Sequence, residues 1–509
     1  MFTRLDYLAF TVLTAINAAA IGWFALYWMR LDGWATSVVL WLATALIVRY
    51  LAIHQMRWFT LLLMRRPLPR PARPGWRVAA VTTFVPEHEP LEMLEQTVEA
   101  LVAMDYPHDV WVLDEGDDER VRALCRRLGA HHFSRRNRPD YQTKTGPFQA
   151  RSKHGNYNAW LHEHGFESYD LIAAFDPDHV PRPHFLTSVL GYFDDPEVGY
   201  VQAAQVYYNQ RASFIARGAA EETYAYYSSI QMAYHGLGHP VVTGCHQTHR
   251  ATALRAVGGF SAHDADDLLL TLHYRAAGWK GVYVPRILAK GLTPVDWAGY
   301  LRQQRRWARS VLDIKLRHHP KLAGRMAPLD RLVSLLHGLY YLQGITALLA
   351  LAVLLYIQAT GRVPGFITYT TGAYAVGLFL VLRLTDFYRQ RFFLDRRAEW
   401  GVLWRASVLQ LAKWPFLLVA FVEAVRGRKS TYDITPKIGT PERQYLLVWP
   451  HLLILLLLAA ALAIGLLTGR GTDPSILGWT ALTAFTSGLF IWSETWGFPE
   501  PYDRSLYPG

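Results

Sequence analysis

Long apolar runs lie toward both ends of the chain and are absent from its middle. The first run, Leu8 to Trp28, has no charged side chain over 21 residues, about the length that a helix needs to cross ~30 Å of hydrocarbon. Arg49 lies near the end of the second run and can snorkel toward the interface. We predict six spanning helices, over Leu8 to Trp28, Trp34 to about Ile53, Leu332 to Thr360, Val363 to Leu382, Tyr445 to Thr468 and Ile476 to Ser493.

A further apolar stretch, Trp400 to Val425, is interrupted by Arg405, Lys413 and Glu423. Each of these charges would cost roughly 2.5–3.5 kcal/mol at the centre of a spanning helix. Their spacing suits a helix that lies along the membrane interface better than one that crosses the membrane. We therefore predict an interfacial helix here and leave it out of the span count.

The middle of the chain alternates between short β-rich runs and amphipathic helical stretches. The pattern predicts strands over 78–86, 109–116 and 169–178, and helices over 90–104 and 117–129. Strands separated by helices of this length form βαβ units, in which a mostly parallel sheet is covered by helices on both faces. In such α/β domains the ligand binds beyond the carboxyl ends of the strands.

The placement of the charged residues predicts how the chain is oriented in the membrane. Hydrophobic residues make up 51 % of the 509 residues, charged residues 18 %, and the net charge is +11. The positive-inside rule places the two basic zones, the central region and both termini in the cytoplasm of a plasma (inner) membrane protein. The basic zones are Arg65, Arg66, Arg70 and Arg73, and Arg389, Arg391, Arg396, Arg397, Arg426, Arg428 and Lys429, whereas the other links carry only Arg362 and Arg470.

The sequence supports neither a nucleic-acid partner nor a structural role for its cysteines. The basic residues follow the membrane ends and no nucleic-acid-binding module is visible, so we expect no nucleic-acid partner. Cys125 and Cys245 both lie in the predicted cytosolic part, where we expect reduced thiols, and they define no disulfide or zinc framework.

Two predicted strands end in acidic residues. The run LIAAFDPDHVP ends in Asp176 and Asp178, and VLDEGDD carries Asp114 and Glu115. If the strand continues through Asp178, Asp176 and Asp178 project to the same side, where a divalent cation such as Mg²⁺ would relieve their repulsion. Asp before Pro is also a common turn opener, so the residues alone leave a solvated turn open.

These motifs resemble the membrane-embedded, processive family 2 glycosyltransferases, the cellulose, chitin and hyaluronan synthases. The resemblance implies a cytosolic GT-A domain with a Rossmann-like sheet, a UDP-sugar donor and Mg²⁺ or Mn²⁺. FDPDHVP resembles the DxD motif, which implies that Asp176 and Asp178 reach the ribose, the diphosphate and the metal. Asp114 takes the place of the aspartate associated with uracil, and Glu115 stands where a second aspartate is often found.

Three further motifs carry the resemblance into the rest of the domain. SKHGNYNAW resembles the Lys-x-Gly-Asn element, in which Lys153 and Asn156 approach the diphosphate. VTGCHQTHR resembles the segment beside the acceptor through Gly244 and Cys245, whereas His179, His246 and His249 receive no role. DADD resembles the Thr-Glu-Asp element.

Counting back from Gly278-Trp279 places the general base at Asp267 and the motif's glutamate at Asp266. A positioned carboxylate can accept the proton of an attacking hydroxyl. The choice between the two aspartates stays open, and a helix-capping role is compatible with either.

The last two motifs concern the leaving group and a loop. LRQQRRWARS carries Gln303-x-x-Arg306-Trp307, in which Arg306 would neutralise the departing diphosphate and Trp307 would support the acceptor sugar. YDITPK resembles the gating loop of cellulose synthases, with Tyr432, Thr435 and Lys437 at its matching positions. This loop favours the cellulose-like branch, whereas QQRRWARS is equally similar to chitin and hyaluronan synthases.

Together these observations predict seven regions. They are 1–64 with two spans, 76–292 with the GT-A domain, 293–325 with interfacial helices, 326–384 with two spans, 385–445 with an interfacial helix and gating loop, 446–496 with two spans, and 497–509 as a short cytosolic tail. Because few residues follow the last span, we expect no appended cyclic-dinucleotide control.

The predicted function is that of a processive, inverting synthase that extends a β-linked polysaccharide, favoured as cellulose-like, from a UDP-sugar and moves it across the bilayer. Alternatives are a synthase using UDP-GlcNAc, a transferase acting on a lipid, and a transporter or nucleotide sensor without catalysis. The sugar, the linkage, the oligomeric state and any export partner are not determined by the sequence.

Overall fold

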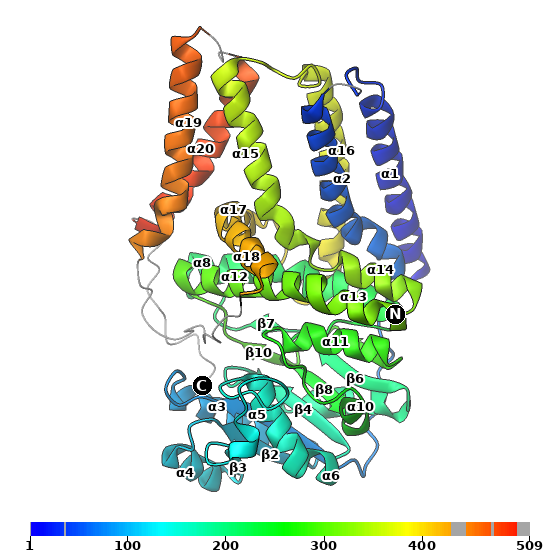
Figure 1. Cartoon of the computed structure of the whole chain (residues 1–509). Helices are drawn as coiled ribbons and strands as arrows, with labels where there is room; N and C mark the ends of the chain where they lie inside the picture. Colours follow the sequence, from blue (N-terminus) through cyan, green and yellow to red (C-terminus); the bar gives the residue numbers. More distant parts are fainter. Residues whose placement is uncertain (1, 35–36, 429–443, 470–472, 496–509) are drawn as a thin grey trace.

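The computed structural model describes residues 2–34, 37–428, 444–469 and 473–495. An α/β domain lies on one side of the molecule and upright helices lie on the other, with a layer of transverse helices between them (Figure 1). The predicted gating-loop residues Tyr432, Thr435 and Lys437 and the tail 497–509 lie outside the described residues.

Within the described residues, the domain is built on a seven-stranded sheet. The strand β8 is antiparallel to its neighbours β4 and β6, and all other neighbouring strands are parallel, which confirms the predicted mostly parallel sheet. In spatial order the strands are β3 (His131–Phe133), β2 (Asp109–Asp114), β1 (Val78–Phe84), β4 (Leu171–Phe175), β8 (Gln247–Arg250), β6 (Val198–Ala203) and β9 (Lys280–Val284). A second, three-stranded sheet has the order β5 (Val180–Pro181), β10 (Ala289–Gly291) and β7 (Val206–Tyr207).

Helices cover both faces of the large sheet because its central strands are apolar on both sides. All residues of β4 are buried, as its sequence LIAAF requires. One face packs against α3 (Leu91–Val102), α4 (Glu119–Leu128) and α7 (Phe185–Val189). The other packs against α5 (Lys153–Trp160), α10 (Ala251–Ala256) and α11 (Asp266–Ala276).

The strand predicted over 169–178 is shorter than expected. β4 ends at Phe175, and Asp176 to Asp178 form a turn in which the His179 N–H donates to the Asp176 carbonyl at 3.1 Å. Pro177 has no N–H to continue a ladder, which accounts for the early end of the strand. The argument from alternation along a strand was therefore wrong for Asp176 and Asp178, and their common orientation has to come from the turn.

Four helices within the described residues are long and apolar enough to cross a membrane: Arg4–Trp28 (α1), Pro328–Thr360, Tyr445–Leu467 and Pro474–Glu494. The second predicted span is also helical, but its apolar part, Val38–Ile53, is shorter. The helix at the fourth predicted span begins only at Tyr369 and continues to Arg389, so that it includes Arg383 and Asp386. These two spans stay predictions.

The upright helices form two packed groups. The first comprises α1, α2 (Val38–Trp58) and α16 (Tyr369–Arg389), and the second comprises α15 (Gln343–Thr360), α19 (Trp449–Leu467) and α20 (Pro474–Thr495) (Figure 1). The third predicted span is interrupted between α14 (Pro328–Leu336) and α15, where Gly338 has a positive φ of 81°.

The stretch predicted as an interfacial helix forms two helices, α17 (Trp404–Ala412) and α18 (Trp414–Arg426), which meet at a bend of 50° and together are apolar enough for one broken span or a re-entrant loop, so its interfacial placement stays a prediction. They pack against α8 (Phe214–Ala225) and α12 (Trp297–Asp313), below the upright helices (Figure 1). Each of the three charges that interrupt this region has an ionic partner: Arg405 with Glu221, Lys413 with Glu222, and Glu423 with Arg305. These pairs offset the cost of desolvating the charges.

The other helical segments of the described chain are short. They are η1 (Phe59–Leu63), η2 (Pro139–Tyr141), η3 (Leu161–Gly165), α6 (Phe166–Ser168), η4 (Leu190–Asp194), η5 (Tyr226–Ile230), α9 (Gln231–Gly236), η6 (Ile314–His318), α13 (His319–Leu322), η7 (Ala323–Arg325), η8 (Leu339–Leu342), η9 (Gln390–Phe392) and η10 (Tyr445–Val448).

Candidate active site

A cavity of about 1310 Å³ lies between the carboxyl ends of the strands and the transverse helices. It brings together residues that are far apart in the sequence and that the motifs predicted as one site. The predicted residues that line it are Glu115, Lys153, Asn156, Asp176, Asp178, Gly244, Asp266, Asp267, Gln303, Arg306 and Trp307. Asp114 and Cys245 are described but are buried away from its lining.

The turn that carries Asp176 and Asp178 is held from several sides. The Thr97 hydroxyl of α3 donates to the Pro177 carbonyl at 2.7 Å, and Asp178 accepts the Leu292 N–H at 3.1 Å. Lys153 Nζ lies 2.5 Å from Asp176 Oδ1 and 2.7 Å from the Gly244 carbonyl. Lys153 therefore joins the turn to the segment beside the predicted acceptor.

His179 places a ring nitrogen, which is a possible metal ligand, beside these two acids. His246 Nδ1 lies 3.0 Å from the Ala204 carbonyl, which can only accept, so Nδ1 carries the proton. Burial lowers the pKa of His246 to about 3, which leaves its Nε2 as an acceptor for His179 Nδ1 at 2.7 Å. His179 Nε2 lies 3.6 Å from Asp178 Oδ2.

This donor set fits a divalent cation. Single ligand atoms of Asp176, Asp178 and His179 all lie within 4.8 Å of one another. An imidazole that donates its other ring nitrogen's proton to a partner is the usual arrangement of a metal-binding histidine. Gly291 leaves room for the buried His179 ring, because a Cβ at that position would lie 2.1 Å from His179 Nε2. Motif matching alone left His179 and His246 without a role; the signal was their position directly after the two acids and beside Gly244-Cys245.

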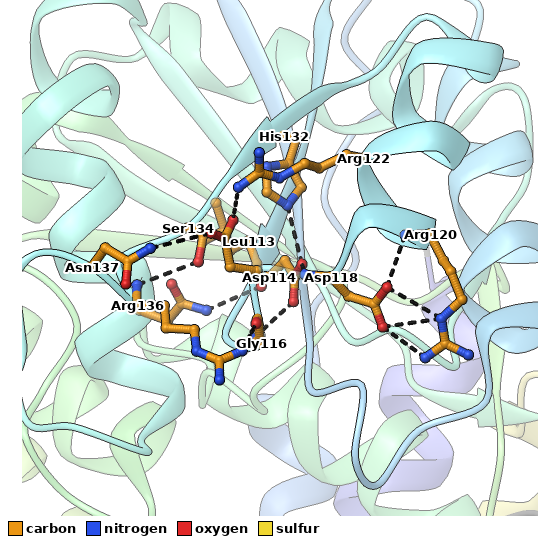
Figure 2. Close-up of polar contacts among 12 residues, drawn as sticks. Leu113, Asp114, Gly116, Asp118, Arg120, Arg122, His132, Ser134, Arg136 and Asn137 are labelled. Atoms are coloured by element: carbon orange, nitrogen blue, oxygen red, sulfur yellow. Dashed lines mark hydrogen bonds and ion pairs between the residues drawn. The ribbon is translucent and has the colours of Figure 1, made fainter.

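The resemblance implies that Asp114 lies beside the uracil of the donor, but its carboxylate is bonded within its own turn. Its carboxylate accepts the N–H groups of Gly116 at 2.8 Å and Asp118 at 2.6 Å, and His132 Nε2 lies 3.1 Å away (Figure 2). The side chain is fully buried. Because the turn after β2 supplies N–H groups, the carboxylate turns inward and shapes the 114–118 turn instead of facing the cavity.

Glu115 lines the cavity but is bound to a buried arginine. Arg135 donates to both of its oxygens at 2.8 and 3.0 Å, and also to the carbonyls of Tyr141, Gln149 and Ser152. Arg135 is fully buried. The pair therefore fixes the loop that leads into Lys153, which sequence reasoning did not anticipate for Glu115.

Asp266 and Asp267 form the first turn of α11 and face the cavity. Burial and the neighbouring Asp266 raise the pKa of Asp267 to about 7, and burial also raises the pKa of Asp266. Gly244, at a φ of 79°, lies against Asp267: a Cβ there would be 3.2 Å from Asp267 Oδ2. This contact places Asp267 beside the predicted acceptor segment and distinguishes it from Asp266.

The opposite wall is the helix α12, which presents Gln303, Arg306 and Trp307 to the cavity. Asp296 caps its start by accepting the Gly299 N–H at 2.7 Å, and the Trp297 indole donates to Ser493 of α20 at 3.0 Å. The helix thus has a defined start and is joined to the upright helices.

The membrane-facing end of the cavity is both polar and aromatic. Lys413 is 1 % exposed and its Nζ donates to Glu222, Tyr300 and Gln304 at 2.8, 3.0 and 2.9 Å. Further lining residues at this end are Tyr226, Tyr340, Tyr341 and Gln410. The sequence did not single out this network, because a lysine in an apolar run shows its partners only after folding.

Comparison with known proteins agrees with this geometry. Residues 78–310 match the family described as glycosyltransferase like family 2. The fold is similar to that of a mannosyltransferase from Pyrobaculum calidifontis solved with GDP-Man and Mn²⁺, with a TM-score of 0.51 at 18 % identity over 76 % of this chain and 99 % of that one. The α/β domain is therefore a glycosyltransferase domain of the GT-A type, and it belongs to family 2.

Curated relatives extend the match beyond this domain. The chain is 26 % identical over 438 residues to cellulose synthase 2 of Novacetimonas hansenii, covering 83 % of this chain and 26 % of that protein. It is 26 % identical over 470 residues to the cellulose synthase catalytic subunit (UDP-forming) of Xanthomonas axonopodis pv. citri, covering 88 % and 61 %. It is thus a distant relative of cellulose synthase catalytic subunits, with several apolar helices, and spans about a quarter to three fifths of their length.

Proposed function

We propose that the chain is an inverting glycosyltransferase that transfers sugar from a UDP-sugar to a growing β-linked polysaccharide, with a cellulose-like β-glucan favoured. The single observation that carries this proposal is the convergence of Asp176, Asp178, Asp267, Arg306 and Trp307 on one cavity. Relatives named as UDP-forming cellulose synthases support the choice of UDP and of glucan.

The donor end of the cavity suits a nucleoside diphosphate. Asp176, Asp178 and His179 would hold Mg²⁺ or Mn²⁺, which supplies positive charge to the diphosphate when it is bound. Arg306 adds a guanidinium for the departing oxygens, and Lys153 adds an ammonium that Asp176 and the Gly244 carbonyl hold in place. Asp114 and Glu115 act through the loops they fix.

Asp267 would accept the proton of the acceptor hydroxyl. The acceptor oxygen forms a bond to the anomeric carbon on the face opposite the diphosphate, the bond from that carbon to the diphosphate oxygen breaks, and UDP leaves with the electron pair. Attack from the opposite face converts an α-linked donor into a β-linkage. Trp307 offers the terminal acceptor sugar a flat apolar surface.

The membrane-facing end favours a sugar polymer over a lipid acceptor. Glu222, Lys413 and Gln410 offer partners for hydroxyl groups, and Tyr340 and Tyr341 offer faces for sugar rings. A polar wall that carries tyrosine rings suits the hydroxyls and ring faces of a sugar better than an alkyl chain. We therefore infer that the polymer leaves the cavity here toward the upright helices, with the catalytic domain and both termini in the cytoplasm.

Membranes containing the full chain test this proposal when they are supplied separately with labelled UDP-glucose, UDP-GlcNAc and UDP-glucuronate plus Mn²⁺. We expect label from UDP-glucose in a polymer that an endo-β-1,4-glucanase degrades, with one UDP released per sugar. A polymer made from UDP-GlcNAc alone would indicate the chitin-type alternative, and one made only when UDP-GlcNAc and UDP-glucuronate are supplied together would indicate the hyaluronan-type alternative. Label confined to organic-solvent-soluble lipid, or the absence of UDP release from all three donors, would contradict the proposal.

A further inference from the structure

The segment before the proposed base, residues 260–265, connects three parts of the site. At its start, the Phe260 N–H donates to Asn158 Oδ1 at 2.8 Å, and Asn158 Nδ2 donates back to the Phe260 carbonyl at 2.9 Å. Gly259 makes room for this contact, since a Cβ there would lie 2.4 Å from Asn158 Oδ1. Asn158 belongs to α5, the helix that begins with Lys153.

The end of the segment is fixed to α12. Arg309, only 8 % exposed, donates through Nη2 to Asp264 Oδ2, and His263 Nε2 lies 3.3 Å from Asp313 Oδ2. Arg309 and Asp313 are four residues apart and thus lie on one face of the helix. The same helix carries Arg306 and Trp307, so these contacts join the base to the leaving-group and acceptor side of the cavity.

The start of α11 is held both from within the helix, where Asp267 Oδ1 accepts the Leu268 N–H at 2.7 Å, and by these contacts. Within the described residues, its N-cap residue is Ala265, whose methyl side chain makes no capping hydrogen bond. The Ala265 N–H instead donates to His263 Nδ1 at 3.0 Å. That bond leaves the proton of a neutral His263 on Nε2, where it is donated to Asp313. These outside contacts therefore add to the helix's own bonds in positioning the first turn of α11, with Asp266 and Asp267.

We propose that Arg309 and Asp264, assisted by His263 and Asp313, are positioning residues that set the place of the Asp267 carboxylate relative to Arg306 and Trp307. This inference rests on the proposed function, in which Asp267 is the base. Loss of the Arg309–Asp264 pair lets the base shift, and a misplacement of about 1 Å costs roughly 10²-fold in rate. Donor binding is unaffected, because the Thr97 and Leu292 contacts hold Asp176 to Asp178 independently.

A double-mutant cycle in the full-length membrane-embedded chain tests this inference. The variants are Arg309→Met, Asp264→Asn and the double variant, with Arg309→Lys as the conservative replacement. The matched control is Arg255→Met, which removes an arginine that pairs with Glu167. Each variant is assayed for kcat of transfer from UDP-glucose and, in the same preparation, for the Kd of UDP in the presence of Mn²⁺.

We expect each single variant to lose about 10- to 100-fold in kcat, the double variant to lose no more than the worse single one, and the Kd of UDP to change less than about twofold. Arg309→Lys should retain most of the rate, and Arg255→Met all of it. Wild-type kcat in Arg309→Met, losses that multiply in the double variant, or a Kd that weakens by the same factor as kcat would each overturn the inference. An active Asp267→Asn variant would instead overturn the proposed base, so the two failures are distinguishable.

Discussion

Replacing Asp267 with asparagine is expected to lower the rate of sugar transfer about 10²- to 10⁴-fold while leaving UDP binding nearly unchanged. The asparagine side chain has the same shape but cannot accept the proton of the attacking hydroxyl, which is the contribution of a general base. The rate is measured as UDP released and sugar incorporated, and UDP affinity is measured by calorimetry in the same detergent preparation.

Asp266→Asn is the matched control for this prediction, because Asp266 lies in the same helical turn and also lines the cavity. It should lose less, since Gly244 lies against Asp267. In the wild type, kcat/KM should rise with pH through about 7 and level off above it, because Asp267 binds a proton below its raised pKa and acts only when ionised. A larger loss in Asp266→Asn would move the base to Asp266, and full activity in both variants would refute the base assignment.

Asp178→Ala is expected to show the second large effect, a loss of about 10²-fold or more in transfer rate at fixed Mn²⁺, because the diphosphate then lacks part of its charge compensation. His179→Ala should raise the Mn²⁺ concentration needed for half-maximal activity about 10- to 100-fold. EDTA should abolish the wild-type activity, and added Mn²⁺ should restore it.

Asp140→Ala provides the control, since Asp140 is an exposed aspartate of η2 that is not among the described residues lining the cavity. It should respond to Mn²⁺ as the wild type does. Activity of Asp178→Ala at the wild-type level, with the same Mn²⁺ dependence, would show that the acids of the turn do not hold the metal.

The fold could be predicted from the sequence because its central signal is local. The strand LIAAF (171–175) is apolar on both faces, and the neighbouring helices show their periodicity within about three turns. The carboxyl-end rule then places Asp176 and Lys153 near each other, and the structure brings them into contact. The apolar pattern did not show where β4 ends. The ladder of backbone hydrogen bonds stops because Pro177, two residues after Phe175, has no N–H.

The remaining differences arise from partners distant in the sequence. Whether Asp114 faces a ligand or its own turn depends on where the Gly116 and Asp118 N–H groups point. Burial of the Lys413 charge is unfavourable unless Glu222, 191 residues away, lies beside it. His179 becomes a candidate ligand only when His246, 67 residues away, lies beside its Nδ1. In each case the residue type was visible in the sequence, but its orientation was set by tertiary contacts.

The most direct test of the central claim is an anomalous difference map from crystals of the chain grown with UDP and Mn²⁺. The account predicts one Mn²⁺ peak within about 2.5 Å of carboxylate oxygens of the Asp176–Asp178 turn and of His179 Nε2, with the UDP diphosphate between this peak and Arg306. A peak outside the cavity, or UDP bound with its diphosphate remote from both the turn and Arg306, would contradict it.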